Sequence, residues 1–223
     1  MSLRKVIEVA RGELGVTEFP AGSNCVKYWT DYTGIGPSMQ GQPWCVCFLW
    51  WCFWKAGEST AFFGGEQTAS CGTLLRWYME QGLMYSASEV QVGDIVILNF
   101  HGTKDTEHCG LVEDILHYSN GVMLVSTVEG NTTPGEEGSQ DNGGCVALKW
   151  RNPSQIVAVC RPQYQPEPQP VDDVTGHWAE KAIRRCMARG LLKGYTDGSF
   201  QPDKPVTRAE IAVILDRMED DLK

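Results

Sequence analysis

Cysteine and histidine are the side chains of this sequence that could together carry out nucleophilic chemistry. Cys45 stands at the start of the apolar run W-C-V-C-F-L-W-W-C-F-W-K-A. Apolar residues cover every face of this run, which predicts a helix over residues 44–56, buried all round and followed by a left-handed Gly57. The helix dipole and the unpaired N–H groups of the first turn favour a thiolate at Cys45. Because free cysteines are often simply buried, a purely structural role for Cys45 stays open.

A nucleophilic thiol needs an imidazole beside it and a third group that orients the imidazole. Of the four histidines, His108 comes directly before the β-rich segment C-G-L-V, whose backbone would hold the ring in place. Glu129 ends the following strand and would meet His108 across an antiparallel pair. Asn131 lies two residues further along, on the same side. The structural alternatives are a solvated turn position for His108 and an ordinary acidic turn residue for Glu129.

Hydrophobic periodicity predicts the elements that must position these residues. Residues 3–14 and 71–82 have the period of two further helices. After residue 90 the chain changes to short β-rich segments separated by turn signals. The segments are residues 94–100, 109–117, 122–128, 144–150 and 156–160. Helices followed by hairpin-connected strands predict an α+β domain with an antiparallel sheet of five to six strands.

The C-terminal quarter of the chain has a different composition. The stretch P-Q-Y-Q-P-E-P-Q-P is typical of an extended, polyproline-like linker. Two helical patterns follow, and T-R-A-E at the start of the second is a capping box with Thr207 as N-cap and Glu210 at N3. We therefore expect a large domain over residues 1–162, a linker over 163–170 and a small helical domain over 171–223.

Composition and cysteine spacing argue against several kinds of partner and site. The formal net charge of the 223-residue chain is -9, which argues against nucleic acid and against an anionic membrane surface as the main partner. No run is long and apolar enough to span a bilayer, and the charged start M-S-L-R-K-V-I-E does not fit a secretory signal. The nine cysteines show no C-x-x-C pair, so neither a metal site nor a disulfide framework is expected.

Four stretches resemble, in order, the motifs of a known family. They are E-L-G-V-T-E-F-P-A-G-S-N, G-Q-P-W-C-V-C-F-L-W-W-C, V-G-D-I-V-I-L-N-F with H-C-G-L-V-E-D-I, and V-E-G-N. The resemblance is to the CHAP family, cysteine- and histidine-dependent amidohydrolases and peptidases of peptidoglycan. It implies a papain-like domain in which Cys45 is the nucleophile, His108 the general base and Glu129 the residue that orients His108. It also implies Asn131 as a further polar member of the site and, more weakly, Gln42 as an oxyanion donor.

The resemblance implies acyl transfer without a cofactor. The Cys45 thiolate would attack an amide carbonyl of the wall peptide or of its link to the glycan, and His108 would protonate the leaving amine and then activate water. Some phage members of the family have an Asp-rich calcium loop before the cysteine. Here that loop reads G-I-G-P-S-M-Q-G-Q-P, without a carboxylate, so no calcium is expected. The choice between an N-acetylmuramoyl-L-alanine amidase and a peptide-crosslink endopeptidase stays open.

The C-terminal segment resembles a second family. D-V-T-G-H-W-A-E-K-A-I and G-Y-T-D-G-S-F-Q-P-D-K-P-V-T-R-A-E-I are similar to an S-layer homology (SLH) domain, a small all-α module that anchors proteins to secondary cell-wall polymers. Arg208, which the cap does not use, is the first candidate for the anionic wall sugar. Trp178, Asp197 and Gly198 are weaker candidates, because helical spacing favours the core for Trp178 and the Asp-Gly pair favours a turn. The family usually works as three repeats, so a single repeat is expected to self-associate, for example as a trimer.

Together the two resemblances predict a modular bacteriolytic enzyme at the bacterial cell wall, with peptidoglycan as substrate. The absence of a signal favours a phage endolysin, released from the host cytoplasm through a holin, over a host autolysin. Two alternatives stay open. One is a catalytically inactive wall-binding protein. The other is an enzyme of another amide class on the same fold, such as a transglutaminase-like or deamidating protein.

Overall fold

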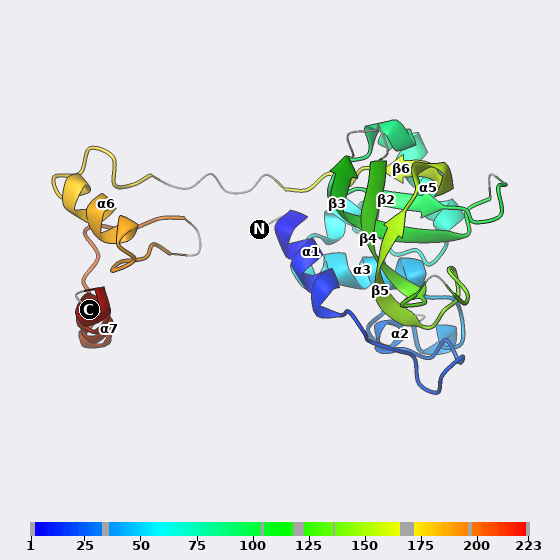
Figure 1. Ribbon diagram of the computed structural model, residues 1–223, viewed down its shortest axis with the longest axis horizontal. Coiled ribbons are helices and arrows are strands. Elements are labelled where there is room, and N and C mark those ends of the chain that lie inside the picture. The colour runs from blue at the N-terminus through cyan, green and yellow to red at the C-terminus, as the bar shows by residue number, and fades with distance from the viewer. Residues whose placement is uncertain are drawn as a thin grey trace. The chain divides into compact units, whose positions relative to one another are not determined.

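The computed structural model describes residues 3–32, 36–103, 105–117, 123–135, 137–165, 172–195 and 198–221. Two compact units divide the chain, Met1–Gln165 and Pro166–Lys223 (Figure 1). Most of the expected linker lies outside the described residues. In the described part of the chain, no helix has the length and apolar character needed to cross a membrane.

The first unit is built on a six-stranded antiparallel sheet, which confirms the predicted α+β class (Figure 1). The strands are β1 (Met84–Tyr85), β2 (Ile95–Leu98), β3 (His108–His117), β4 (Met123–Thr132), β5 (Cys145–Arg151) and β6 (Ile156–Cys160). Their order in the sheet is β1-β6-β2-β3-β4-β5. The short edge strand β1, which pairs with β6, is the one that periodicity did not predict.

Strand β2 is apolar throughout because both of its faces are buried. Ile95 and Ile97 belong to the main core shared with the helices. Val96 and Leu98 belong to a smaller core on the other face of the sheet. An uninterrupted apolar run between turn signals is the pattern expected for a strand covered on both sides.

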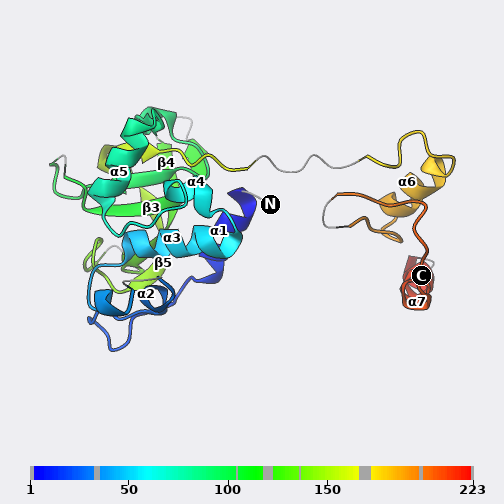
Figure 2. The ribbon, with the colours of Figure 1, turned by 180° about the vertical axis from the view of Figure 1, so that it is seen from behind.

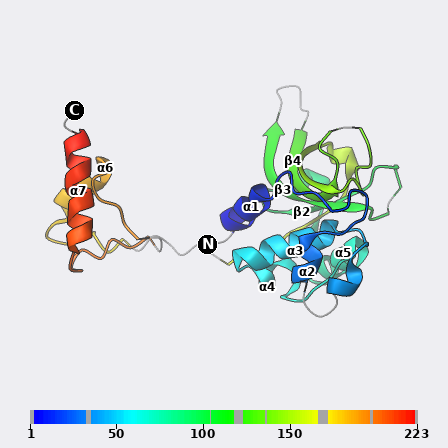
Figure 3. The ribbon, with the colours of Figure 1, turned by 90° about the horizontal axis from the view of Figure 1, so that it is seen from below.

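The helices of the first unit pack mainly against the main core. They are α1 (Leu3–Gly12), α2 (Lys27–Asp31), α3 (Cys45–Ala56), α4 (Ser59–Phe63) and α5 (Cys71–Glu80). Figure 3 shows α3, α4 and α5 on one side of strands β2 to β4. Helix α3 runs through the middle of the unit (Figure 2) and contacts α1, α2, α4, β3 and β4. It ends at Gly57 with φ 77°, in the predicted left-handed conformation.

A glycine in β4 allows helix α3 to approach the sheet closely. A Cβ atom on Gly130 would lie 2.6 Å from the Cβ of Phe48 and 2.7 Å from its Cγ. Phe48 lies in the first turns of α3 and is fully buried. The contact therefore sets the distance between the start of α3, which carries Cys45, and strand β4, which carries Glu129.

Gly130→Ala should destabilise the first unit by about 1–3 kcal/mol, because the added methyl overpacks a buried contact. Urea unfolding measures this change in the free energy of unfolding. Gly12→Ala is the control, since a Cβ at Gly12 meets nothing within 4 Å. Equal stability of Gly130→Ala and wild type would show that α3 can shift without cost.

The second unit contains helices α6 (Glu180–Ala188) and α7 (Arg208–Asp221). The predicted capping box at the start of α7 is confirmed. The Thr207 N–H donates to the Glu210 carboxylate at 2.7 Å, and the Glu210 N–H donates to the Thr207 hydroxyl at 3.2 Å. The core position favoured for Trp178 is wrong, because this side chain is 91% exposed. Helix α6 begins only after Trp178, so the helical spacing on which that prediction rested does not apply there.

Candidate active site

Cys45 is the first residue of helix α3 and carries a nearly buried thiol. Its Sγ lies 3.9 Å from the Sγ of Cys71, the first residue of α5. With Cys109 of β3, the three Sγ atoms all lie within 4.8 Å of one another. The thiols of Cys109 and Cys71 lower the pKa of Cys45 well below its ordinary value, and His108 adds to this, so that burial is outweighed. The surroundings of Cys45 therefore favour its thiolate form.

His108 opens strand β3 and meets Glu129 of strand β4 inside the unit. The Nε2 of His108 lies 3.0 Å from Oε2 of Glu129, and both side chains are fully buried. The Nδ1 atom of His108 is buried and has no hydrogen-bond partner among the described residues. Burial lowers the pKa of His108, but Cys45 and Glu129 outweigh it and raise the pKa to about 9. Nδ1 is thus the ring nitrogen that the bond to Glu129 leaves unpaired.

An arginine holds Glu129 in place. Arg151, the last residue of β5, donates from Nε to Oε1 of Glu129 at 2.7 Å and from Nη2 to Oε2 at 2.5 Å. The hydroxyl of Thr127 donates to Oε1 at 2.6 Å. Burial raises the pKa of Glu129, but Arg151 and His108 outweigh it and lower the pKa to about 2. Glu129 therefore stays a carboxylate that can orient His108 and stabilise its imidazolium.

A glycine makes room for this carboxylate. A Cβ atom on Gly110 would lie 2.8 Å from the Cγ of Glu129 and 3.1 Å from the Cβ of Thr127. Gly110 stands in the motif H-C-G-L-V, two residues after His108. Neither Gly110 nor Arg151 was predicted for the site. Ala147 lies opposite Glu129 in the β4–β5 pair. Because every second residue of a strand lies on the same face, alternation from Ala147 through Lys149 could have pointed to Arg151.

The structure places the two remaining candidates away from these hydrogen bonds. Asn131 is buried with φ 61°, and its side-chain amide donates to Oδ1 of Asn142 at 3.0 Å, in the loop after β4. Gln42 is exposed, and its backbone carbonyl accepts a hydrogen bond from the Trp29 indole at 3.2 Å. Asn131 is thus bonded to the loop after β4, and Gln42 is bonded to helix α2.

The candidates for wall-polymer binding are dispersed over the second unit. Arg208 is the exposed first residue of α7, and Trp178 precedes α6. Gly198 has φ 86° and donates its N–H to the Tyr195 carbonyl at 3.0 Å, as a turn residue does. Asp197 lies outside the described residues. A hollow in this unit is lined by other residues, among them Leu191, Tyr195, Phe200, Lys204, Val213 and Arg217.

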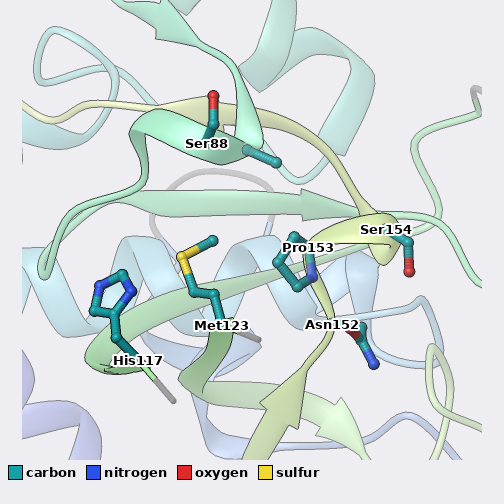
Figure 4. Close-up of a pocket in the computed structure, with 7 residues that line it drawn as sticks. Ser88, His117, Met123, Asn152, Pro153 and Ser154 are labelled. Carbon is teal, nitrogen blue, oxygen red and sulfur yellow. The ribbon is translucent and has the colours of Figure 1, made fainter. Parts of the chain in front are cut away.

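The first unit also has a hollow on the face of the sheet away from α3. His117, Met123 and Pro153 lie around it (Figure 4). Met123 packs against the smaller core, which places this hollow on that side. The described residues that line it do not include Cys45 or His108. It is therefore separate from the candidate active site.

The buried His108–Glu129 pair predicts how stability depends on pH. Folding lowers the pKa of Glu129 from 4.5 to about 2, so its contribution is present above pH 4.5 and is lost as the pH falls through 2. Folding raises the pKa of His108 from 6.5 to about 9, so its contribution is present below pH 6.5 and is lost as the pH rises through 9. Together they stabilise the fold most between pH 4.5 and 6.5.

Denaturant unfolding at a series of pH values measures this dependence. In His108→Gln the loss of stability on the alkaline side should become smaller than in wild type. The acid-side loss should persist while Glu129 still pairs with Arg151. An alkaline-side loss of the same size in both proteins would contradict the assignment to His108.

Two family models match the chain. Residues 37–131 match the CHAP domain, and residues 172–212 match the S-layer homology domain. The first match contains Cys45, His108 and Glu129, and the second contains Trp178 and Arg208. The comparison with solved structures gave no match.

Curated relatives match over short segments. Outer membrane protein SlpA of Deinococcus radiodurans is 41% identical over 56 residues, which cover 25% of this chain and 5% of that protein. Cell surface glycoprotein 1 of Acetivibrio thermocellus is 51% identical over 39 residues, 18% of this chain and 2% of that protein. The cellulosome-anchoring protein of the same organism is 42% identical over 45 residues, 20% of this chain and 10% of that protein. The chain thus spans a tenth or less of these relatives.

These matches agree with the resemblances seen in the sequence. A CHAP domain indicates a peptidoglycan hydrolase, and an S-layer homology domain indicates association with the cell wall. The proteins matched by short segments carry names of cell-surface proteins. The chain therefore contains a CHAP domain followed by an S-layer homology domain.

Proposed function

We propose that the protein hydrolyses amide bonds of peptidoglycan by a thiol mechanism, with Cys45 as nucleophile, His108 as general base and acid, and Glu129 as its orienting carboxylate. The observation that supports this most is the fully buried His108–Glu129 pair, whose second imidazole nitrogen is unpaired, beside a thiol of lowered pKa. A histidine held by a carboxylate and coupled to a cysteine is the arrangement that activates a sulfur nucleophile. The domain would then be papain-like.

The steps follow from the protonation states of these groups. The Cys45 thiolate attacks the amide carbonyl, and the backbone N–H of Cys45 stabilises the oxyanion, with Gln42 as a further donor. Protonated His108 gives its proton to the leaving amine. It then removes a proton from the water that releases the acyl group. Glu129, kept ionised by Arg151, stabilises the imidazolium in both steps. Asn131, two residues further along β4, is a further polar candidate of the proposed site.

Digestion of purified peptidoglycan, followed by mass spectrometry of the fragments, tests this function. Release of intact stem peptides from the glycan would identify an amidase. Cleaved crosslinks with intact lactyl-amide bonds would identify an endopeptidase. New reducing sugar ends, or no cleavage by a folded and reduced protein, would reject the proposal. Ammonia release without chain cleavage would instead indicate a deamidating enzyme.

The second unit is proposed to be an all-α module, over residues 171–223 after a linker at 163–170, that binds a secondary cell-wall polymer. The two helices and the capped start of α7 support this proposal. Arg208 is exposed at that start, where a guanidinium can pair with an anionic sugar substituent. Trp178 is exposed, which supports a role for its indole as a platform for a sugar ring. Asp197 and Gly198 are proposed only as weaker candidates for contact with the wall polymer.

Arg208→Gln should weaken sedimentation of the protein with purified walls by roughly tenfold, about the effect of losing one charge-assisted contact. Arg185→Gln is the matched control, because Arg185 is also exposed but lies on α6. Light scattering of the same samples reports self-association. We propose that wall binding by this single repeat requires self-association, for example as a trimer, and a monomer that still binds walls would reject this. Equal binding by both variants would reject Arg208 as the contact.

A lytic enzyme of this kind fits a phage endolysin that reaches the wall from the host cytoplasm through a holin, with a host autolysin as the alternative. Expression in a Gram-positive host with and without a co-expressed holin separates the two. Lysis only with the holin supports the endolysin. Lysis without it indicates another route across the membrane.

A further inference from the structure

Three cysteines that are far apart in the sequence come together at the start of helix α3. Cys45 opens α3, Cys71 opens α5, and Cys109 is the second residue of β3. Their Sγ atoms all lie within 4.8 Å of one another, and the Cys45–Cys71 pair is 3.9 Å apart. The proposed mechanism uses the sulfur of Cys45 alone. The other two thiols are therefore buried groups whose convergence calls for a separate explanation.

The spacing of the three sulfurs fits a thiophilic metal ion. Zinc binds thiolate sulfur at about 2.3 Å in tetrahedral geometry, which places two sulfur ligands about 3.8 Å apart. The Cys45–Cys71 distance of 3.9 Å matches this separation, and the sulfur of Cys109 lies within 4.8 Å of both. In the structure all three cysteines are free thiols, so none of them is committed to a disulfide.

Two further features of the surroundings point to a ligand. Cys45 is the first residue of helix α3, where the unpaired N–H groups favour the thiolate that a metal requires. The Nδ1 of His108 is fully buried without a hydrogen-bond partner among the described residues. It is a candidate for the fourth ligand, and Glu129 on Nε2 would orient it as carboxylates orient metal-bound histidines.

We propose that Cys45, Cys71 and Cys109 form a binding site for a thiophilic divalent ion such as Zn²⁺, and that an ion bound there occupies the nucleophile of the hydrolase. Binding of the ion needs only the three thiols. Its inhibitory consequence rests on the function proposed above. The site departs from the sequence-based expectation of no metal, which considered spacing along the chain, because the ligands come from three separate elements. Cys45 and Cys71 retain 5% and 8% exposure, whereas Cys109 is fully buried.

Titration of the full-length, reduced and metal-free protein with Co²⁺ alone tests the site. One equivalent should produce thiolate-to-cobalt charge-transfer absorption, and Zn²⁺ should abolish it by displacement. Cys71→Ser and Cys109→Ala should each weaken Zn²⁺ binding by at least about tenfold, since each removes one ligand of a small set. Cys52→Ala is the matched control, because Cys52 is fully buried on the same helix as Cys45 but outside the cluster. It should bind Zn²⁺ like wild type.

Circular dichroism establishes that each variant is folded before it is titrated. If Cys109→Ala does not fold, Cys71→Ser decides, because Cys71 lies at the edge of the core. No cobalt–thiolate absorption in folded wild type, or undiminished absorption in both cluster variants, would overturn the site.

Peptidoglycan hydrolysis is measured on the same samples. Zn²⁺ should inhibit wild type, a chelator should restore activity, and Cys71→Ser should need at least about tenfold more Zn²⁺ relative to its own basal rate. Metal binding by a protein that never cleaves peptidoglycan would reject the proposed function and leave the site standing. Cleavage of peptidoglycan by a protein that does not bind the metal would reject the site and leave the proposed function standing.

Discussion

Replacing Cys45 by alanine should lower peptidoglycan hydrolysis by about 10⁴-fold or more, because removal of the nucleophile of a catalytic triad leaves only binding and oxyanion stabilisation. The thiol opens α3 next to His108, whose Nε2 already pairs with Glu129. The substitution removes one buried sulfur and leaves the His108–Glu129 pair in place. The release of soluble wall fragments over time measures the loss.

The controls for this experiment separate chemistry from folding and from wall binding. Cys52→Ala removes another buried sulfur from the same helix and should keep full activity. Cys45→Ala should still sediment with walls, since the second unit is unchanged. Lysis by folded Cys45→Ala at the wild-type rate would leave the thiol mechanism untenable.

Arg151→Leu should destabilise the first unit by about 3–5 kcal/mol, the usual cost of leaving a buried charge without its partner. Arg151 donates two hydrogen bonds to Glu129 and one to Gln140, and its side chain is 2% exposed. Its guanidinium also packs over the Phe100 ring, with 4.7 Å between the guanidinium carbon and the ring centroid. Activity should fall as well, because a protonated or displaced Glu129 no longer orients His108. Urea unfolding measures the first effect and fragment release the second.

A double variant distinguishes lost charge pairing from lost packing. Glu129→Gln/Arg151→Leu removes both charges and should recover part of the stability lost in Arg151→Leu. It should not recover activity, because an amide cannot stabilise the imidazolium. Lys5→Leu is the surface control, since Lys5 pairs with Glu8 at 2.7 Å while both side chains are exposed, and it should change stability little. A double variant no more stable than Arg151→Leu would assign the loss to packing.

The sequence predicted those features that depend on one segment. The all-apolar run gave helix α3 with its left-handed Gly57, and T-R-A-E gave the cap of α7. The order of helices and strands gave the α+β class. The contact between His108 and Glu129 was also within reach, since it follows from the pairing of two neighbouring strands.

Features that depend on register or on distant segments were not predictable from local pattern. Arg151 follows the predicted end of its strand, and its bonds to Glu129 depend on the β4–β5 register, in which Glu129 lies opposite Ala147 and Arg151 opposite Val125. The cysteine cluster depends on how α5 packs beside α3 and β3. For Trp178 the local pattern itself misled. Its helical spacing with the residues of α6 predicted a core position, but α6 begins only at Glu180.

Arg151 has a consequence for how such proteins can be recombined. Every side chain in the proposed triad and its support lies between Cys45 and Arg151, and strand β6 completes the sheet at Cys160. A genetic crossover after Gln165, where the first compact unit ends, would thus transfer the whole chemical apparatus. A crossover between β4 and β5 would instead leave Glu129 without its counter-ion. Exchange of targeting modules is therefore tolerated at one junction and disfavoured within the sheet.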